Sequence, residues 1–146
     1  MKYTKTTAAI FIATGMGLTA IAQKINSKQI PAAVKASFAK TYPAVKTIKW
    51  EREKGNFEAG FKQGNNEMSA VFKADGTQTE SEMEISSATL PAPVLAYVKQ
   101  NYKGATIKEA AKITKTDTGE VNYEAEVQGK DLLFDHTGKF IKIAKD

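Results

Sequence analysis

An internal repeat constrains the fold of this chain more than any other feature of its sequence. When residues 25–42 are placed over residues 85–102, seven of the eighteen positions are identical. The offset of 60 drifts to 59 at Ile48 and Ile107, then rises to 66 after a longer hairpin loop and ends at 62. Matches that keep one order along the chain indicate a duplication. They include two aromatic-Glu-Ala triplets, at positions 57–59 and 123–125.

Each repeat predicts one helix followed by antiparallel strands. Val34, Phe38 and Tyr42 recur every four residues and therefore share one helix face. Alternation of apolar and polar residues follows, with short turns such as Asp75-Gly76 between the runs, which is typical of an antiparallel meander. The predicted fold class is α+β, with two tandem helix-plus-antiparallel-strand repeats.

The two repeats, residues 23–84 and 85–146, are expected to form one compact body. A unit of about 60 residues with a single helix buries too little apolar surface to be stable alone. The units can share a core either by pairing their edge strands or by packing their helices together. Both arrangements satisfy the sequence pattern.

Residues 1–22 have the pattern of a signal peptide. Lys2 and Lys5 precede an apolar stretch of about 15 residues, shorter than the roughly 20 needed to cross a bilayer. Small residues at Ala20 and Ala22 fit a cleavage site before Gln23. We therefore predict an exported protein, periplasmic or secreted, that is not inserted in the membrane after cleavage.

Charge and composition exclude several classes of protein. The net charge of +5 falls to +3 without Lys2 and Lys5, because 19 basic side chains then stand against 16 acidic ones. Both halves interleave the two signs, whereas a nucleic-acid-binding protein needs a basic patch. The chain has no cysteine, which excludes disulfides, thiolate metal sites and cysteine nucleophiles.

No catalytic, metal-binding or cofactor-binding motif is recognisable in the sequence. The single histidine, His136, is interpreted as a hairpin-turn residue, because a general base or a metal centre needs partner residues. Ser27 and Ser87 precede the helices and are interpreted as N-caps. Without a nucleophile, base and oxyanion-binding set, we predict a protein that is not an enzyme and uses no cofactor.

The opening of each repeat, Ile-x-Ser-x-x-(Ile/Leu)-Pro-Ala-x-Val, is followed by a tyrosine at the helix end and a Phe-x-x-(Asp/Thr)-Gly hairpin. This combination resembles the PepSY-like family, also described as β-lactamase-inhibitor-like, over residues 25–146. The resemblance implies helix-plus-four-strand units whose strands form one sheet, with both helices against one face. It also implies export from a bacterial cell and no assigned activity. PepSY modules of peptidase propeptides are associated with binding or inhibiting peptidases, although fold does not carry function.

Glu80, Glu82 and Glu84 alternate along one predicted strand and therefore point to one face. They are interpreted as part of a solvated edge strand whose like charges discourage aggregation. A Ca²⁺ site or a surface for a basic partner is the alternative.

Trp50, Arg52 and Glu109 are the candidate partner-binding residues. The drifted offset places Trp50 over Glu109, and a carboxylate is rarely buried without a partner. If the repeats use equivalent faces, Trp50 is exposed, and tryptophan beside arginine is typical of a binding hot spot. A tryptophan that lines the seam between the repeats is the alternative.

These observations together predict a non-catalytic exported binding module that presents a sheet face to a protein or peptide, with inhibition of the partner as an option. The alternative is a small-molecule or metal-ion binder in a cleft between the two repeats. No nucleic-acid partner is expected. The partner's identity and the oligomeric state stay open at this point.

Overall fold

The structure, a computed structural model, describes residues 23–144. The predicted signal peptide, residues 1–22, lies outside this range, so its cleavage stays a prediction. Within the described range, no helix is long and apolar enough to cross a membrane.

The elements of the described chain follow the order that the repeat predicts. The first repeat contains β1 (Gln23–Lys24), the 3-10 turn η1 (Ser27–Gln29), α1 (Ala32–Thr41), β2 (Ile48–Glu53), β3 (Asn56–Gln63), β4 (Asn66–Phe72) and β5 (Gln78–Glu84). The second contains the 3-10 turn η2 (Ser87–Thr89), α2 (Ala92–Asn101), β6 (Ile107–Lys115), β7 (Val121–Val127), β8 (Lys130–Asp135) and β9 (Phe140–Ala144). Apart from β1, both repeats have the order 3-10 turn, helix and four strands.

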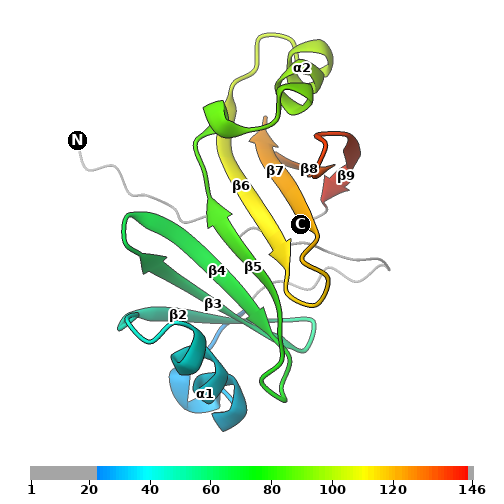
Figure 1. Cartoon of the computed structure of the whole chain (residues 1–146). Coiled ribbons are helices and arrows are strands. Elements are labelled where there is room, and N and C mark those ends of the chain that lie inside the picture. Colours follow the sequence, from blue (N-terminus) through cyan, green and yellow to red (C-terminus); the bar gives the residue numbers. More distant parts are fainter. Residues whose placement is uncertain (1–22, 145–146) are drawn as a thin grey trace, which may run out of the picture.

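All nine strands form one antiparallel sheet in which they follow one another in chain order. The repeats join where β5 pairs with β6, with Glu82 opposite Ile113. Edge-strand pairing is therefore the arrangement by which the two units combine. Figure 1 shows α1 and α2 near opposite ends of the molecule, with the central strands between them. The predicted α+β fold with one sheet is confirmed.

Both helices cover the same face of this sheet. Residues paired directly across neighbouring strands point to the same face, and the pairing can be followed from β2 to β8. Val34 and Phe38 of α1, and Val94 and Val98 of α2, are buried against it. We call the opposite side of the sheet the helix-free face.

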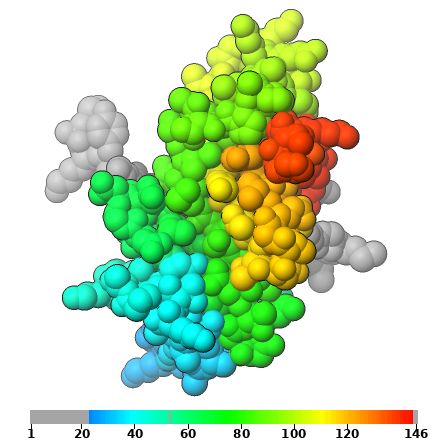
Figure 2. Space-filling view, in the orientation of Figure 1, coloured from blue at the N-terminus to red at the C-terminus, as the bar shows by residue number. Residues whose placement is uncertain are grey.

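Each repeat has its own hydrophobic cluster on the helix side. The first is rich in aromatic rings, and Phe38 of α1 lies 5.0 Å from Phe61 and 5.1 Å from Tyr42 between ring centres. The second is mostly aliphatic, with a stacked pair, Tyr97 and Phe140, at its border. In the space-filling view the green β4 and β5, the last strands of the first repeat, lie between its blue and cyan residues and the yellow-to-red strands of the second repeat (Figure 2).

The (Asp/Thr)-Gly hairpin of each repeat packs against the start of its helix. Gly76 has φ +87°, and a Cβ there would lie 2.6 Å from the carbonyl oxygen of Ala33 in α1. Gly138 occupies the equivalent turn, where a Cβ would lie 3.1 Å from Pro91. A side chain at Gly76 would collide with the start of α1, and one at Gly138 would press tightly against the start of α2. Both positions also have positive φ, +87° and +86°, which favours glycine.

The side-chain caps belong to the 3-10 turns before the helices, and they lie one residue earlier than predicted. Asn26 Oδ1 accepts a hydrogen bond from the Lys28 amide at 2.9 Å, and Ser86 Oγ accepts one from the Ala88 amide at 3.3 Å. The interpretation of Ser27 and Ser87 as N-caps is therefore wrong. A 3-10 turn precedes each helix and begins at these serines, so the residue before each of them is the cap.

Candidate functional site

Trp50 lies in the core of the first repeat. Its side chain is 7% exposed, and its ring centre lies 5.6 Å from that of Phe38 in α1 and 6.4 Å from that of Phe72 in β4. The buried residues of its cluster all belong to the first repeat, so Trp50 packs under α1 and not at the seam. The prediction that Trp50 faces water or a partner is wrong.

A β-bulge explains this error. The pairing of β6 with β7 shifts register between Ile107 and Glu109, so β6 has one residue more than β2 at this point. Trp50 and Ala110 pair with the matching alanines of β3 and β7. Trp50 therefore corresponds to the buried Ala110 and not to Glu109. A shift of one residue turns every side chain to the opposite face.

Arg52 and Glu109 lie on opposite faces of the sheet. Arg52 is exposed on the helix side, with its guanidinium carbon 5.6 Å from the ring centre of Phe57. Glu109 is half-buried on the helix-free face, opposite Glu126. Burial, followed by the charge of Glu126, raises the pKa of Glu109. The structure does not bring the three candidate residues together, and their role in partner binding stays a prediction.

His136 lies in the exposed turn between β8 and β9, as interpreted from the sequence. The neighbouring Asp135 is engaged by the turn itself, since its Oδ1 accepts hydrogen bonds from the amides of Thr137 at 2.9 Å and Lys139 at 3.0 Å. These bonds lower the pKa of Asp135. His136 and Asp135 are therefore arranged as residues of a hairpin turn.

Carboxylates gather instead on the helix-free face of the central strands. We define the acidic face by eight side chains that the strand register places there: Glu58 of β3, Glu80, Glu82 and Glu84 of β5, Glu109 of β6, Glu124 and Glu126 of β7, and Asp131 of β8. Strand β5 pairs with both β4 and β6. The interpretation of its glutamates as a solvated edge strand is therefore wrong, because β5 lies at the middle of the sheet.

Three carboxylates of the acidic face are buried. Glu58, Glu82 and Glu124 are 8%, 9% and 1% exposed, although α1 and α2 both lie on the other side of the sheet. Ile113 and Leu133 are buried beside them. On one face of a sheet, side chains of neighbouring strands lie close enough to shield one another from water.

Burial and mutual repulsion raise the pKa values of these carboxyl groups. Loss of water raises the pKa of Glu82 well above its ordinary range, and the charges of Glu124 and Glu58 raise it further. For Glu124, loss of water and then the charges of Asp131 and Glu80 raise the pKa to about 8. Glu124 is therefore mostly protonated at neutral pH.

Two buried oxygen atoms on this face have no hydrogen-bond partner among the described residues, namely Oε2 of Glu124 and Oδ1 of Asn122. Asn122 is 4% exposed and lies two residues before Glu124 on the same face of β7. Its Nδ2 donates to Oε1 of Glu120 at 3.2 Å. A buried acceptor without a donor is unfavourable, so a ligand that supplied donors here would stabilise the fold.

Lysines at the margin of the helix-free side pair with carboxylates there. The Nζ–Oε distances are 2.7 Å for Lys62–Glu67, 3.0 Å for Lys108–Glu126 and 3.3 Å for Lys115–Glu120. None of these three pairs includes Glu82 or Glu124. Across residues 23–144, no group of three or more histidine, aspartate and glutamate side chains is placed to hold a metal ion.

The repeat carried a signal for this site that sequence reasoning did not use. Glu58 and Glu124 are the central residues of the matching aromatic-Glu-Ala triplets, and both are buried. Alternation within each triplet places the glutamate opposite the core. A glutamate retained at one position in both copies could have indicated a role on the helix-free face.

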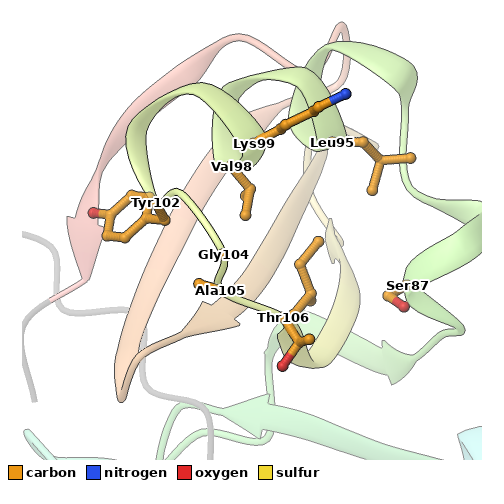
Figure 3. Close-up of a pocket in the computed structure, with 9 residues that line it drawn as sticks. Ser87, Leu95, Val98, Lys99, Tyr102, Gly104, Ala105 and Thr106 are labelled. Carbon is orange, nitrogen blue, oxygen red and sulfur yellow. The ribbon is translucent and has the colours of Figure 1, made fainter.

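Equivalent hollows lie between each helix and its first strand. The larger, of about 470 Å³, is lined by α2 and the start of β6, and Figure 3 shows Val98 pointing into it while the amine of Lys99 points away. The smaller, of about 320 Å³, lies under α1 and includes Trp50. Each hollow lies within a single repeat, so neither is a cleft between the two repeats. The predicted cleft between the repeats stays a prediction.

Comparison with known proteins places this fold in a family. A model of the family described as "Putative beta-lactamase-inhibitor-like, PepSY-like" matches the chain twice, over residues 4–77 and 56–142. The chain belongs to the PepSY-like family. The two PepSY-like matches overlap over residues 56–77, and they confirm the resemblance seen in the sequence. No curated protein sequence matches the chain significantly.

Solved structures share this PepSY-like fold. A DUF2874 family protein from Bacteroides ovatus has a TM-score of 0.67 at 18% identity, over 77% of this chain and 85% of that one. A protein of Bacteroides eggerthii described as "putative periplasmic" has a TM-score of 0.66 at 16% identity, over 77% and 86%. A BLIP-like protein from Bacteroides fragilis has a TM-score of 0.62 at 22% identity, over 80% and 89%. At these identities the likeness concerns the fold.

Proposed function

We propose that this chain is a non-catalytic, exported binding module that presents the helix-free face of its sheet to a protein or peptide. The observation that carries the proposal is the burial of Glu58, Glu82 and Glu124 on that face. Apolar residues of similar size would cost less free energy at these positions. Carboxylates retained there are therefore best explained by a role in binding.

Two further observations support this function. Both helices lie on the other side of the sheet, so neither α1 nor α2 covers the acidic face. The family is described by its likeness to β-lactamase inhibitors, proteins that act by binding an enzyme, and inhibition of a partner enzyme is thus one form that this binding could take. Location in the periplasm or outside the cell follows from the proposed signal peptide and agrees with the description of the Bacteroides eggerthii structure.

The test compares two surface variants in a capture experiment on bacterial envelope extract. One carries Glu80→Lys and Glu126→Lys on the acidic face, and the control carries Leu95→Asp and Lys99→Glu at the hollow beside α2. Circular dichroism and thermal unfolding establish that both variants are folded.

The proposal predicts that a protein captured by the wild-type chain is lost with the acidic-face variant and retained with the hollow variant. Loss with the hollow variant alone would place binding at the groove between helix and strand. Equal capture by all three proteins would show that the acidic face takes no part.

A further inference from the structure

We propose that Glu82, Asn122 and Glu124 form a recess that receives one arginine or lysine side chain from a basic segment of the partner protein. The inference rests on the proposed function, because it names the chemistry by which the acidic face would recognise its partner.

The three polar side chains surround a small apolar floor. Ile113 of β6 lies directly between Glu82 and Asn122 in the strand register. Ala111 lies opposite Glu124 on the same face. Ala111 and Ile113 are both buried. Because Ala111 and Ile113 are both 0% exposed, the side chains above them must turn outward before a long basic side chain can enter. Its apolar stem can then lie over this floor while its charged head reaches the carboxylates.

Once Glu124 is ionised, the unmatched polar atoms of the recess are both acceptors. Oε2 of Glu124 and Oδ1 of Asn122 have no hydrogen-bond partner within the described residues, and Glu124 is 1% exposed. A guanidinium group has five N–H donors and an ammonium group has three, and neither has an acceptor. A cationic side chain therefore supplies the hydrogen-bond donors that these two oxygen atoms lack.

The spacing of the carboxylates fits an extended cation better than a metal ion. Neighbouring strands lie about 5 Å apart, and alternate residues of one strand about 7 Å apart. Ca²⁺ needs its oxygen ligands within about 2.6 Å of one point, and no metal-binding group occurs over residues 23–144. Guanidinium hydrogen bonds spread in a fixed fork and can reach separate carboxylates.

The surroundings of the recess favour a partner segment with more than one positive charge. Acidic side chains face it from three strands, with Glu58 on β3, Glu80 on β5 and Asp131 on β8. Lys115 of β6 acts on Glu80 from one side, and Lys142 of β9 lies in the same row as Glu124, across Leu133. A free monocation would meet only the centre of this surface, whereas a basic peptide also meets its margin.

Cation binding at this recess requires ionised carboxylates. Glu124, with a pKa of about 8, must release its proton when the cation enters, and affinity therefore rises with pH. For one coupled proton, the dissociation constant falls up to about tenfold per pH unit below the pKa of the free site.

The experiment measures binding of a fluorescein-labelled arginine–alanine peptide to the full chain by anisotropy, between pH 6 and pH 9 at fixed ionic strength. A peptide with citrulline at each arginine position is the uncharged probe. Variants Glu124→Gln and Glu82→Gln remove one recess carboxylate each. Glu67→Gln is the matched control, because Glu67 is a partly exposed carboxylate that pairs with Lys62 outside the recess.

We expect Glu124→Gln and Glu82→Gln each to weaken binding about tenfold or more at pH 8.5, and Glu124→Gln to flatten the pH dependence. Glu67→Gln should change affinity less than about twofold, and the citrulline peptide should not bind. Equal effects of Glu67→Gln and Glu124→Gln would overturn the recess in favour of diffuse attraction. Competition by micromolar Ca²⁺, or equally tight binding of free arginine amide, would overturn the choice of ligand.

Failure of this inference is distinguishable from failure of the proposed function. One outcome is that a captured partner is lost with the Glu80→Lys, Glu126→Lys variant although arginine peptides do not bind at the recess. The acidic face then binds its partner by other chemistry. If capture does not depend on that variant, the binding role of the face itself is wrong.

Discussion

Replacement of Glu124 by glutamine should make the chain more stable than the wild type in mildly alkaline solution. Glutamine keeps the shape of the side chain and cannot ionise. In the folded chain, loss of water and the charges of Asp131 and Glu80 raise the pKa of Glu124 from 4.5 to about 8. Below pH 4.5 the carboxyl group is protonated in both states. Between 4.5 and 8 only the unfolded chain releases the proton, so the free energy of unfolding falls as pH rises.

The magnitude follows from this difference in pKa. At 1.36 kcal/mol per pH unit, a pKa of about 8 in place of 4.5 corresponds to roughly 5 kcal/mol. This is an upper bound, since the side chain can turn towards water when it ionises. Over the accessible range from pH 5.5 to 9, the wild type should lose up to about 3 kcal/mol more than Glu124→Gln.

Urea unfolding followed by Trp50 fluorescence at pH 5.5, 7 and 9 provides the measurement. Glu67→Gln serves as the control and should follow the wild type, because an exposed ion pair contributes at most about 1 kcal/mol. If the wild type and Glu124→Gln lose the same free energy between pH 5.5 and 9, Glu124 is not a buried acid and the reasoning is refuted.

Four other predictions concern the fold and the processing of the chain. Trp50→Ala should cost roughly 3–5 kcal/mol, as expected for a large core residue, and wild-type emission should be blue-shifted and protected from iodide; red-shifted, quenchable emission would contradict the burial. Gly76→Ala should destabilise the chain by more than about 1 kcal/mol and by more than Gly55→Ala, which has φ +84° but no neighbour within 4 Å; equal losses would show that the contact with Ala33 is unimportant. Residues 23–84 and 85–146 expressed separately should be unfolded or associate, whereas the intact chain should melt in one transition; two independent transitions would show separate domains. Exported protein should begin at Gln23 on N-terminal sequencing, and a chain that starts at Met1 would rule out the signal peptide.

The duplication predicted the fold well because it determines the order of elements and their periodicity. The helix-plus-four-strand repeat and the (Asp/Thr)-Gly hairpins both appear where the sequence indicates. The arrangement of the repeats was open between two choices, since β5 has the same alternating pattern whether it is an edge strand or a central one. Its glutamates were misread for this reason.

The site was harder to predict because it depends on register and on which strands become neighbours. One extra residue near Lys108 changes which side chains of β6 face the core, and nothing in the alternation of β6 marks the bulge. Trp50 was compared with Glu109 as a result. Glu58 and Glu124 were visible as a repeated triplet, but their burial depends on the assembled sheet and not on the sequence around each of them.

The central claim is that the acidic face, and not a groove beside a helix, is the binding surface. Amide chemical shifts of the ¹⁵N-labelled chain, recorded while the arginine–alanine peptide is added, test it most directly. The account predicts that the largest shifts fall at residues 80–84, 111–113 and 122–126. Shifts confined to residues 95–107, around the hollow beside α2, would contradict it.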